Sequence, residues 1–181
     1  MNITLKRLTE NELELLMNWR MREDITKYLF TNPQLTLEGQ RKWFDKIKDD
    51  KSQIRWIIYI DDSPVGTMFL DDINYTHKRC EMGWFIADKK IRSLELAMTL
   101  QQNMYDYVFD ILEFNRVCGY IMDENKKVLM LDTYCGFEYE GLLKGYIYKD
   151  KKFHDAYLVG LTKEIWQEKK KKFGYKRINI E

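Results

Sequence analysis

The chain has little proline and glycine, with two prolines and nine glycines among 181 residues. Stretches rich in these residues mark flexible linkers and low-complexity segments, and none occurs here. We therefore expect a single domain over residues 1–181, in which residues 163–181 form a basic C-terminal helix and tail. No apolar run approaches the ~20 residues that a membrane-spanning helix needs. The N-terminus is charged and alternating, unlike a signal or transit peptide, so we expect no membrane partner.

Cysteine and histidine are also scarce. The three cysteines, Cys80, Cys118 and Cys135, show no Cys-x-x-Cys spacing, which argues against a disulfide framework and against a zinc site. We expect buried free thiols and a cytoplasmic protein. The two histidines, His77 and His154, have no partners at metal-ligand spacing, so the sequence predicts no metal.

Charge of either sign is not in excess. Lysine and arginine number 30, aspartate and glutamate 29, and the formal net charge is +1. This balance gives no reason to propose a nucleic-acid partner. The one basic run, residues 169–172, is interpreted as the solvated end of the last helix, where cations suit the helix dipole. A hydrophobic content of 45% is enough for a packed core.

The first fifty residues read as a strand followed by helices. Residues 3–8 alternate between apolar and polar side chains, which is typical of a strand. Thr9 and Glu12 have the spacing of a capping box, so a helix should follow them. A short helix is expected over residues 24–30, and Thr36 is a candidate N-cap for a third.

The rest of the chain alternates strands with helices. The β-branched and aromatic content predicts strands at 55–60, 65–70, 79–87 and 116–122 and in a hairpin at 138–148 and 153–162. Helical spacing predicts helices at 93–112 and 125–134, the second one stopped by Gly136. The strands that flank the 93–112 helix should be parallel neighbours. We expect an α/β fold: a mixed, mostly antiparallel twisted sheet with helices on both faces.

This order resembles the GNAT N-acetyltransferase fold, and local motifs strengthen the resemblance. The segment 116–125 with Val128, Leu131, Gly136 and Phe137 resembles the family's last core strand and its Asn…Ala…Leu-Tyr…Gly-Phe helix. Further patterns resemble the branch that holds ribosomal-protein and nucleotide-linked aminosugar acetyltransferases: Trp19-Arg20, Trp43-Phe44, Glu140 to Leu143, Tyr146 to Asp150, His154-Asp155 and Gly160-Leu161.

The resemblance implies a coenzyme pyrophosphate loop of the form Arg/Gln-x-x-Gly-x-Gly/Ala at a helix N-terminus, where free amides favour anions. The matching residues are Arg92, Ser93, Leu94, Glu95, Leu96 and Ala97. Glu95 replaces the central glycine. Either its carboxylate turns outward and the backbone still binds the coenzyme, helped by the cations of Lys89, Lys90 and Arg92, or the anion site is lost. We favour the first, although these cations would also suit an ordinary solvated turn.

Other roles follow from the same resemblance. The backbone of Phe85, Ile86 and Ala87 would hold the pantetheine arm, and Asn125 would contact the coenzyme or simply cap its helix. Glu81 would act as the base that takes the amine proton; the alternative is a solvent-facing or salt-bridged glutamate. The family's proton-donating tyrosine corresponds to Asp132, and an ionised aspartate cannot donate a proton.

We therefore expect an N-acetyltransferase that uses acetyl-CoA and a small-molecule amine. An amino sugar on a nucleotide carrier is favoured over a protein N-terminus or a polyamine. Trp19, Arg20 and Tyr28 are the candidate acceptor residues, although core packing is the default role of such aromatics. An exposed strand edge could support a homodimer. The alternative function is a GNAT-shaped binding or regulatory module without transfer activity, because Glu95 and Asp132 both depart from the family pattern.

Overall fold

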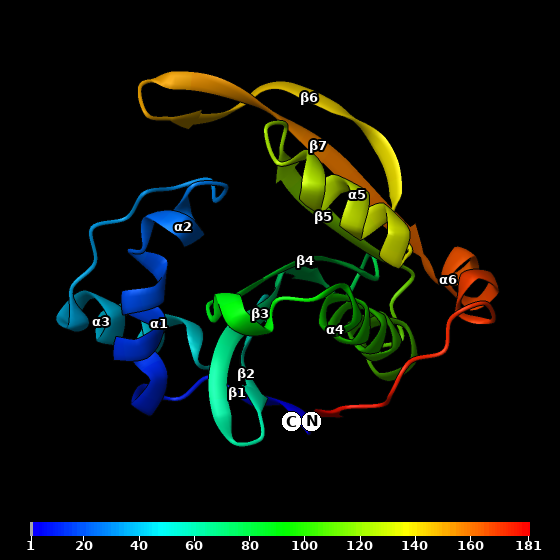
Figure 1. The fold of residues 1–181 in the computed structure, drawn as a ribbon, viewed down its shortest axis with the longest axis horizontal. Helices are drawn as coiled ribbons and strands as arrows, with labels where there is room; N and C mark the ends of the chain where they lie inside the picture. Colours follow the sequence, from blue (N-terminus) through cyan, green and yellow to red (C-terminus); the bar gives the residue numbers. More distant parts are fainter. Residues whose placement is uncertain (1) are drawn as a thin grey trace.

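The computed structural model describes residues 2–181, which form one eight-stranded sheet with the strand order β6-β7-β5-β4-β3-β2-β1-β8 (Figure 1). Within these residues, the β4–β5 and β1–β8 pairs are parallel and the other pairs are antiparallel. The mixed, mostly antiparallel sheet is therefore confirmed. The strands are β1 (Ile3–Arg7), β2 (Ile54–Ile60), β3 (Ser63–Asn74), β4 (Arg79–Ile86), β5 (Arg116–Met122), β6 (Glu138–Lys149), β7 (Lys152–Thr162) and β8 (Asn179–Ile180).

Helices cover both faces of the sheet, as Figure 1 shows for α1 to α3 on one side and α4 on the other. The alternation along β2 explains this arrangement. Trp56 and Ile58 pack in the core cluster that holds α4, whereas Ile57 between them packs with α1. The helices are α1 (Leu13–Arg20), α2 (Glu23–Thr26), α3 (Leu37–Ile47), α4 (Leu94–Asp106), α5 (Lys126–Cys135) and α6 (Lys163–Lys170).

Side-chain caps begin the helices where the sequence predicts them. Thr9 and Glu12 form the capping box, which opens a short 3-10 turn (Glu10–Glu12) ahead of α1. The Thr36 hydroxyl accepts a hydrogen bond from the Gly39 amide at the start of α3. Caps of this kind depend only on residues two or three positions apart, which is why the sequence alone locates them.

Three features differ from the sequence-based expectations. The second helix ends at Thr26, so residues 27–30 are not helical. The long helix changes to a π-helical turn over Tyr107–Ile111. Strand β8 was not expected at all. It is too short to show a period, and a long-range hydrogen bond from the Trp56 indole to the Glu181 carbonyl (2.8 Å) helps to hold it beside β1.

The two parallel central strands separate after three residue pairs. Pairing between β4 and β5 ends at Glu81 and Cys118. Beyond that point β4 stays paired with β3 as far as Ile86, and β5 stays paired with β7 as far as Met122. One side of the β4 backbone therefore faces an opening instead of a neighbouring strand.

The three cysteines are buried and free, as expected. No helix within residues 2–181 has the length and apolar character to cross a lipid bilayer.

Candidate active site

A cleft of about 760 Å³ lies where β4 and β5 separate, bordered by α2, by the segment that follows it, by the start of α4 and by α5. Most of the site residues named from the sequence line this cleft. They are Arg20, Tyr28, Glu81, Phe85, Ile86, Arg92, Ser93, Leu94, Leu96, Ala97 and Asn125. Within residues 2–181, the other three, Trp19, Ala87 and Glu95, are not among its lining residues.

The N-terminus of α4 borders the cleft with amides that the helix does not use. The Ser93 hydroxyl accepts from the Leu96 amide (3.1 Å), and the Ala97 amide donates to the Ser93 carbonyl (3.1 Å). The first turn of a helix has no intrahelical acceptors for its remaining N–H groups, which here belong to Leu94 and Glu95. These two amides and the positive end of the dipole favour an anion.

The Glu95 carboxylate does not block this position. Glu95 is exposed, and within the described residues its side chain makes no hydrogen bond or ion pair. The Glu95 carboxylate therefore accepts no hydrogen bond from the amides of the first turn. The outward orientation of Glu95 and coenzyme binding by these amides remain predictions from the sequence.

Cations gather beside the same helix terminus around one carboxylate. Asp24 Oδ2 lies 2.9 Å from Arg22 Nη2, 3.4 Å from Lys89 Nζ and 3.5 Å from Arg92 Nη2. The hydrogen bonds from Arg22 are the main reason that the pKa of Asp24 falls to about 2. Three cations against one carboxylate leave a positive excess at the mouth of the cleft, which suits a phosphate-bearing ligand.

The backbone at the end of β4 already has partners within the chain. The Ile86 carbonyl accepts from Arg92 Nε (3.0 Å), and the Ala87 carbonyl accepts from Arg22 Nη2 (3.0 Å). The Ala87 amide donates to the Val65 carbonyl (2.7 Å). Ala87 therefore ends the strand as a structural junction, while the Ile86 carbonyl is held by a side chain that also faces the anion position.

Glu81 is a half-buried carboxylate of the cleft that has no cationic partner within residues 2–181. Asp71 pairs with Arg55 (2.6 Å) and Asp72 pairs with Arg79, whereas within residues 2–181 Glu81 makes no ion pair. Partial burial raises the pKa of Glu81, and the negative charges of Asp72 and Asp71 raise it further. A half-buried, unpaired carboxylate with a raised pKa has the properties of a general base.

Sequence reasoning did not single out Tyr120, which also lines the cleft. Its ring stacks on Tyr146 with the ring centroids 5.4 Å apart. Burial, and then the charges of Cys118 and Glu81, raise the pKa of Tyr120 to about 12, so its hydroxyl stays protonated and can donate a hydrogen bond. The two-residue period of a strand could have pointed to Tyr120, because it puts Tyr120 on the same face of β5 as Cys118. Cys118 is the residue that pairs with Glu81 on β4.

Asp132 lies at the inner wall of the cleft and is only 7% exposed. Its Oδ1 accepts a hydrogen bond from Gln101 Nε2 (2.5 Å), and Gln101 Oε1 accepts one from the Tyr105 hydroxyl (2.7 Å). Burial raises the pKa of Asp132 to about 7, against the smaller opposing effect of the Gln101 hydrogen bond. With a pKa of about 7, both the protonated and the ionised forms of this carboxyl are populated at neutral pH, and the protonated form can donate a proton.

The remaining named residues divide between the cleft and the core. Asn125 begins α5 without a side-chain capping bond, and it lines the cleft. Arg20 donates to the Thr31 hydroxyl (3.2 Å), and within residues 2–181 it forms no ion pair. Trp19 is 8% exposed and meets the Phe85 ring edge-on, at 6.5 Å between centroids. Its contacts are those of a core residue behind the cleft wall.

Comparisons with known proteins agree with this geometry. The profile of the acetyltransferase (GNAT) domain matches residues 2–138. Acetyltransferase PseH from Campylobacter jejuni strain 81-176 is 28% identical over 132 residues, which cover 71% of this chain and 80% of PseH. Spermidine N(1)-acetyltransferase from Vibrio cholerae is 26% identical over 155 residues, which cover 85% of this chain and 89% of that protein.

A solved structure supports the fold. The crystal structure of spermidine N-acetyltransferase from Vibrio cholerae in complex with CoA and spermine has a TM-score of 0.85 and 23% sequence identity. The match covers 92% of this chain and 98% of that one. At this identity the likeness speaks for the fold alone. Because the domain profile covers well over half of the sequence, the chain belongs to the GNAT acetyltransferase family and is an acyltransferase whose acetyl donor is acetyl-CoA.

Proposed function

We propose that this acetyltransferase acts on the amino group of a sugar carried by a nucleoside diphosphate. The proposal rests on one observation about Arg20. Its guanidinium lines the cleft and has no carboxylate partner within residues 2–181. Burial, and then the positive charge of Arg55, lower its pKa. An unpaired, partly desolvated guanidinium attracts an anionic group, and a diphosphate offers bidentate acceptors for it.

The acidic side chains argue against a polyamine as the acceptor. A polyamine carries several positive charges, so its site needs several carboxylates that are not already neutralised. Asp24, Asp71 and Asp72 are each paired with cations, and burial raises the pKa of Asp132 to about 7, so Glu81 is the unpaired carboxylate that remains to meet a cationic acceptor. A single free carboxylate suits one amino group better than a chain of them.

The coenzyme fits along the opening between the central strands. The α4 amides of Leu94 and Glu95 and the cation of Arg92 would hold its pyrophosphate. The side of β4 that faces the opening at Phe85 and Ile86, where Arg92 already binds the Ile86 carbonyl, would hold the pantetheine arm, and Asn125 would contact it from α5. Ala97 keeps the first turn of α4 free of a large side chain beside the cleft.

The reaction needs a neutral amine and a protonated leaving sulfur. Glu81 would accept the proton that the ammonium group loses, after which nitrogen attacks the acetyl carbonyl carbon. The nitrogen then loses a second proton to solvent as the amide forms. As the carbon–sulfur bond breaks, the carboxyl of Asp132 would donate its proton to the sulfur and regain one from solvent. The Tyr120 hydroxyl, protonated at neutral pH, would donate a hydrogen bond within the cleft. We place this reaction in the cytoplasm, where three buried free thiols remain reduced.

The test compares two kinds of acceptor. Purified protein is incubated with acetyl-CoA and either a uridine-diphosphate-linked amino sugar or spermidine, and the products are identified by mass spectrometry. We expect acetylation of the nucleotide-linked sugar. The Arg20→Met variant should raise the KM for this sugar by about ten-fold or more, as the loss of a charged hydrogen-bond partner implies. Faster acetylation of spermidine, unaffected by Arg20→Met, would overturn the acceptor assignment.

A further inference from the structure

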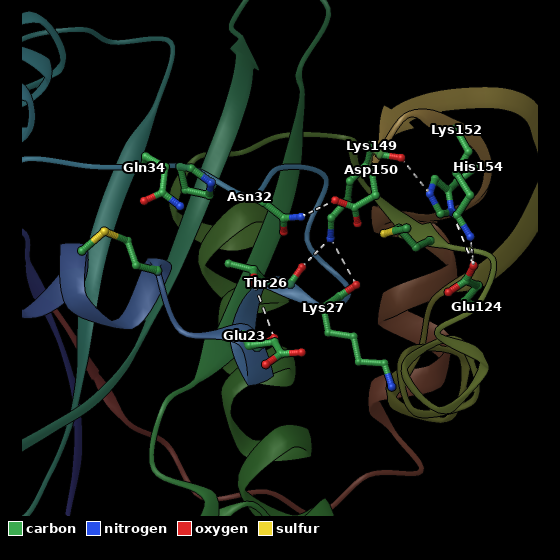
Figure 2. A pocket seen from close by; sticks show the side chains of 13 residues that line it. Glu23, Thr26, Lys27, Asn32, Gln34, Glu124, Lys149, Asp150, Lys152 and His154 are labelled. Atoms are coloured by element: carbon green, nitrogen blue, oxygen red, sulfur yellow. Dashed lines mark hydrogen bonds and ion pairs between the residues drawn. The ribbon is translucent and has the colours of Figure 1, made fainter.

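A second hollow, of about 390 Å³, lies between α2 and the hairpin of β6 and β7 (Figure 2). One short segment separates it from the active-site cleft. Thr26, Lys27 and Asn32 line the second hollow, whereas residues 28–31, between them, line the cleft. Whatever holds this segment in place therefore also shapes the acceptor side of the cleft.

Lys149, close to the tip of the hairpin, holds this segment. Its Nζ donates hydrogen bonds to the carbonyls of Thr26 (2.6 Å), Lys27 (3.2 Å) and Leu29 (2.8 Å), and Figure 2 shows the ammonium pointing toward the Thr26 and Lys27 backbone. An ammonium group has three donors, and all three are used. Lys149 is only 6% exposed and within residues 2–181 has no carboxylate partner, so the three carbonyls compensate for its burial.

Two further contacts join the segment after α2 to the β6–β7 hairpin and its neighbouring strand. The Asn32 side-chain amide donates to Asp150 Oδ1 (2.7 Å), which lies in the hairpin turn. Phe30 packs against the small cluster of Met122, Ile147 and Ala156 on β5, β6 and β7. The Thr26 carbonyl, at the end of α2, also accepts a hydrogen bond from the Leu29 amide (2.9 Å), whereas within residues 2–181 no backbone amide donates to the Lys27 or Leu29 carbonyl. Without Lys149 the Lys27 and Leu29 carbonyls would depend on water for a hydrogen bond.

His154 supports the lysine from the opposite strand. Its Nε2 lies 3.3 Å from the Lys149 carbonyl, and its Nδ1 lies 3.4 Å from Glu124 Oε1. His154 is 8% exposed. The backbone that carries Lys149 is thus tied to the loop after β5, which leads into α5 and the other wall of the cleft.

We propose that Lys149 is a positioning residue that fixes residues 26–31 as the acceptor wall of the cleft. We call its three carbonyl contacts, together with the Asn32–Asp150 hydrogen bond, the Lys149 clamp. The inference rests on the proposed function, because it takes residues 28–31 to contact the acceptor. The clamp does not touch the α4 terminus or β4, so it acts on acceptor binding and not on the coenzyme.

The test uses Lys149→Met, which keeps the length of the side chain but removes the ammonium. Lys144→Met, at an exposed lysine of the same strand, is the matched control. Hydrogen–deuterium exchange should show amides 27–32 exchanging about ten-fold faster or more in Lys149→Met, with α4 unchanged, because loss of the clamp lowers the cost of local opening. Lys144→Met should match the unmodified protein. Unchanged exchange of residues 27–32 in a folded Lys149→Met would overturn the proposal.

Steady-state kinetics distinguish a loss of acceptor positioning from a general loss of structure. In Lys149→Met the acceptor KM should rise about ten-fold while kcat and the acetyl-CoA KM stay within about two-fold. An equal rise in both KM values would contradict the proposal. If Lys149→Met does not fold, Asn32→Ala removes only the exposed part of the clamp, and amides 27–32 should still exchange faster. If the unmodified protein acetylates no nucleotide-linked sugar, the proposed function fails, and the exchange measurement still decides whether the clamp holds the wall.

Discussion

Gln101 on α4 and Asp132 on α5 lie 31 residues apart in the chain, and the Gln101 side-chain amide donates a 2.5 Å hydrogen bond to the Asp132 carboxyl. Both side chains are buried. Their environment raises the pKa of Asp132 from an ordinary value of 3.8 to about 7, because burial disfavours the charged form. The ionisation of one side chain should therefore affect both the stability and the chemistry of the protein.

Stability should depend on the charge of Asp132. A carboxyl whose pKa is raised on folding favours the folded state fully below its unfolded pKa, and this contribution is lost as pH rises through the folded pKa. The window here runs from about pH 4 to about pH 7. Asp132→Asn keeps an oxygen for Gln101 and cannot ionise. Its stability relative to the unmodified protein should increase between pH 4 and pH 8, by at most ~4 kcal/mol from a shift of about three pKa units.

Urea unfolding at several pH values measures this difference. Asp49→Asn, at an exposed position, is the control and should show no such increase. A constant difference between Asp132→Asn and the unmodified protein over pH 4 to 8 would mean that Asp132 is ionised throughout.

The pH dependence of kcat should also reflect the ionisation of Asp132, acting here as a proton donor. A proton donor works in its protonated form, so its contribution to kcat should decline as pH rises through about 7. Asp132→Asn should reduce kcat by about 10²-fold, the lower end of the range for general acid catalysis, and should remove the alkaline decline. A pH–rate profile of kcat tests this. An alkaline decline that survives in Asp132→Asn would assign it to another group.

Glu81 should govern the acid side of the profile. A base must be ionised, so kcat/KM should fall as pH drops toward the raised pKa of Glu81. Glu81→Gln should lower kcat by about 10²- to 10⁴-fold at neutral pH and leave acetyl-CoA affinity nearly unchanged.

A neighbouring variant tests the cause of the shift. Asp72→Asn removes a negative charge that raises the pKa of Glu81, so the acid limb should move to lower pH. It also frees Arg79, whose positive charge acts in the same direction. An acid limb in the same place in Asp72→Asn would show that another group produces it.

Coenzyme affinity should depend only weakly on Glu95. Glu95 is exposed and does not line the cleft, so its charge acts at a distance through solvent. Glu95→Gln and Glu95→Gly should both tighten binding by about two- to five-fold at low salt, as expected for ~0.3–1 kcal/mol beside a helix terminus. Titration calorimetry with acetyl-CoA measures this. Unchanged or weaker binding by both variants would mean that Glu95 does not repel the coenzyme.

Features set by neighbours in sequence could be predicted without a structure. The Thr9 and Thr36 caps and the strand alternation depend on residues a few positions apart. The parallel pairing of β4 with β5 follows from the handedness of the crossover around α4. The family's coenzyme-loop pattern led to the start of α4, although this chain lacks the central glycine.

Features that need distant partners could not be predicted. The neutral form of Asp132 depends on burial against α4, and the positive cluster depends on Asp24, 68 residues from Arg92. Lys149 meets carbonyls more than a hundred residues away. Trp19, a candidate for the acceptor wall, packs behind that wall because α1 turns it toward Phe85. In each case the tertiary fold decides which side chains meet.

The central claim is that the opening between β4 and β5, together with the α4 terminus, forms a functional acetyl-CoA site. Thermal unfolding with and without acetyl-CoA tests it most directly, because a ligand that binds only the folded state stabilises that state. With the ligand at about 100 times its Kd, stabilisation of ~2.7 kcal/mol should raise Tm by about 5–10 °C for a chain of this size. No change in Tm at millimolar acetyl-CoA would contradict the account.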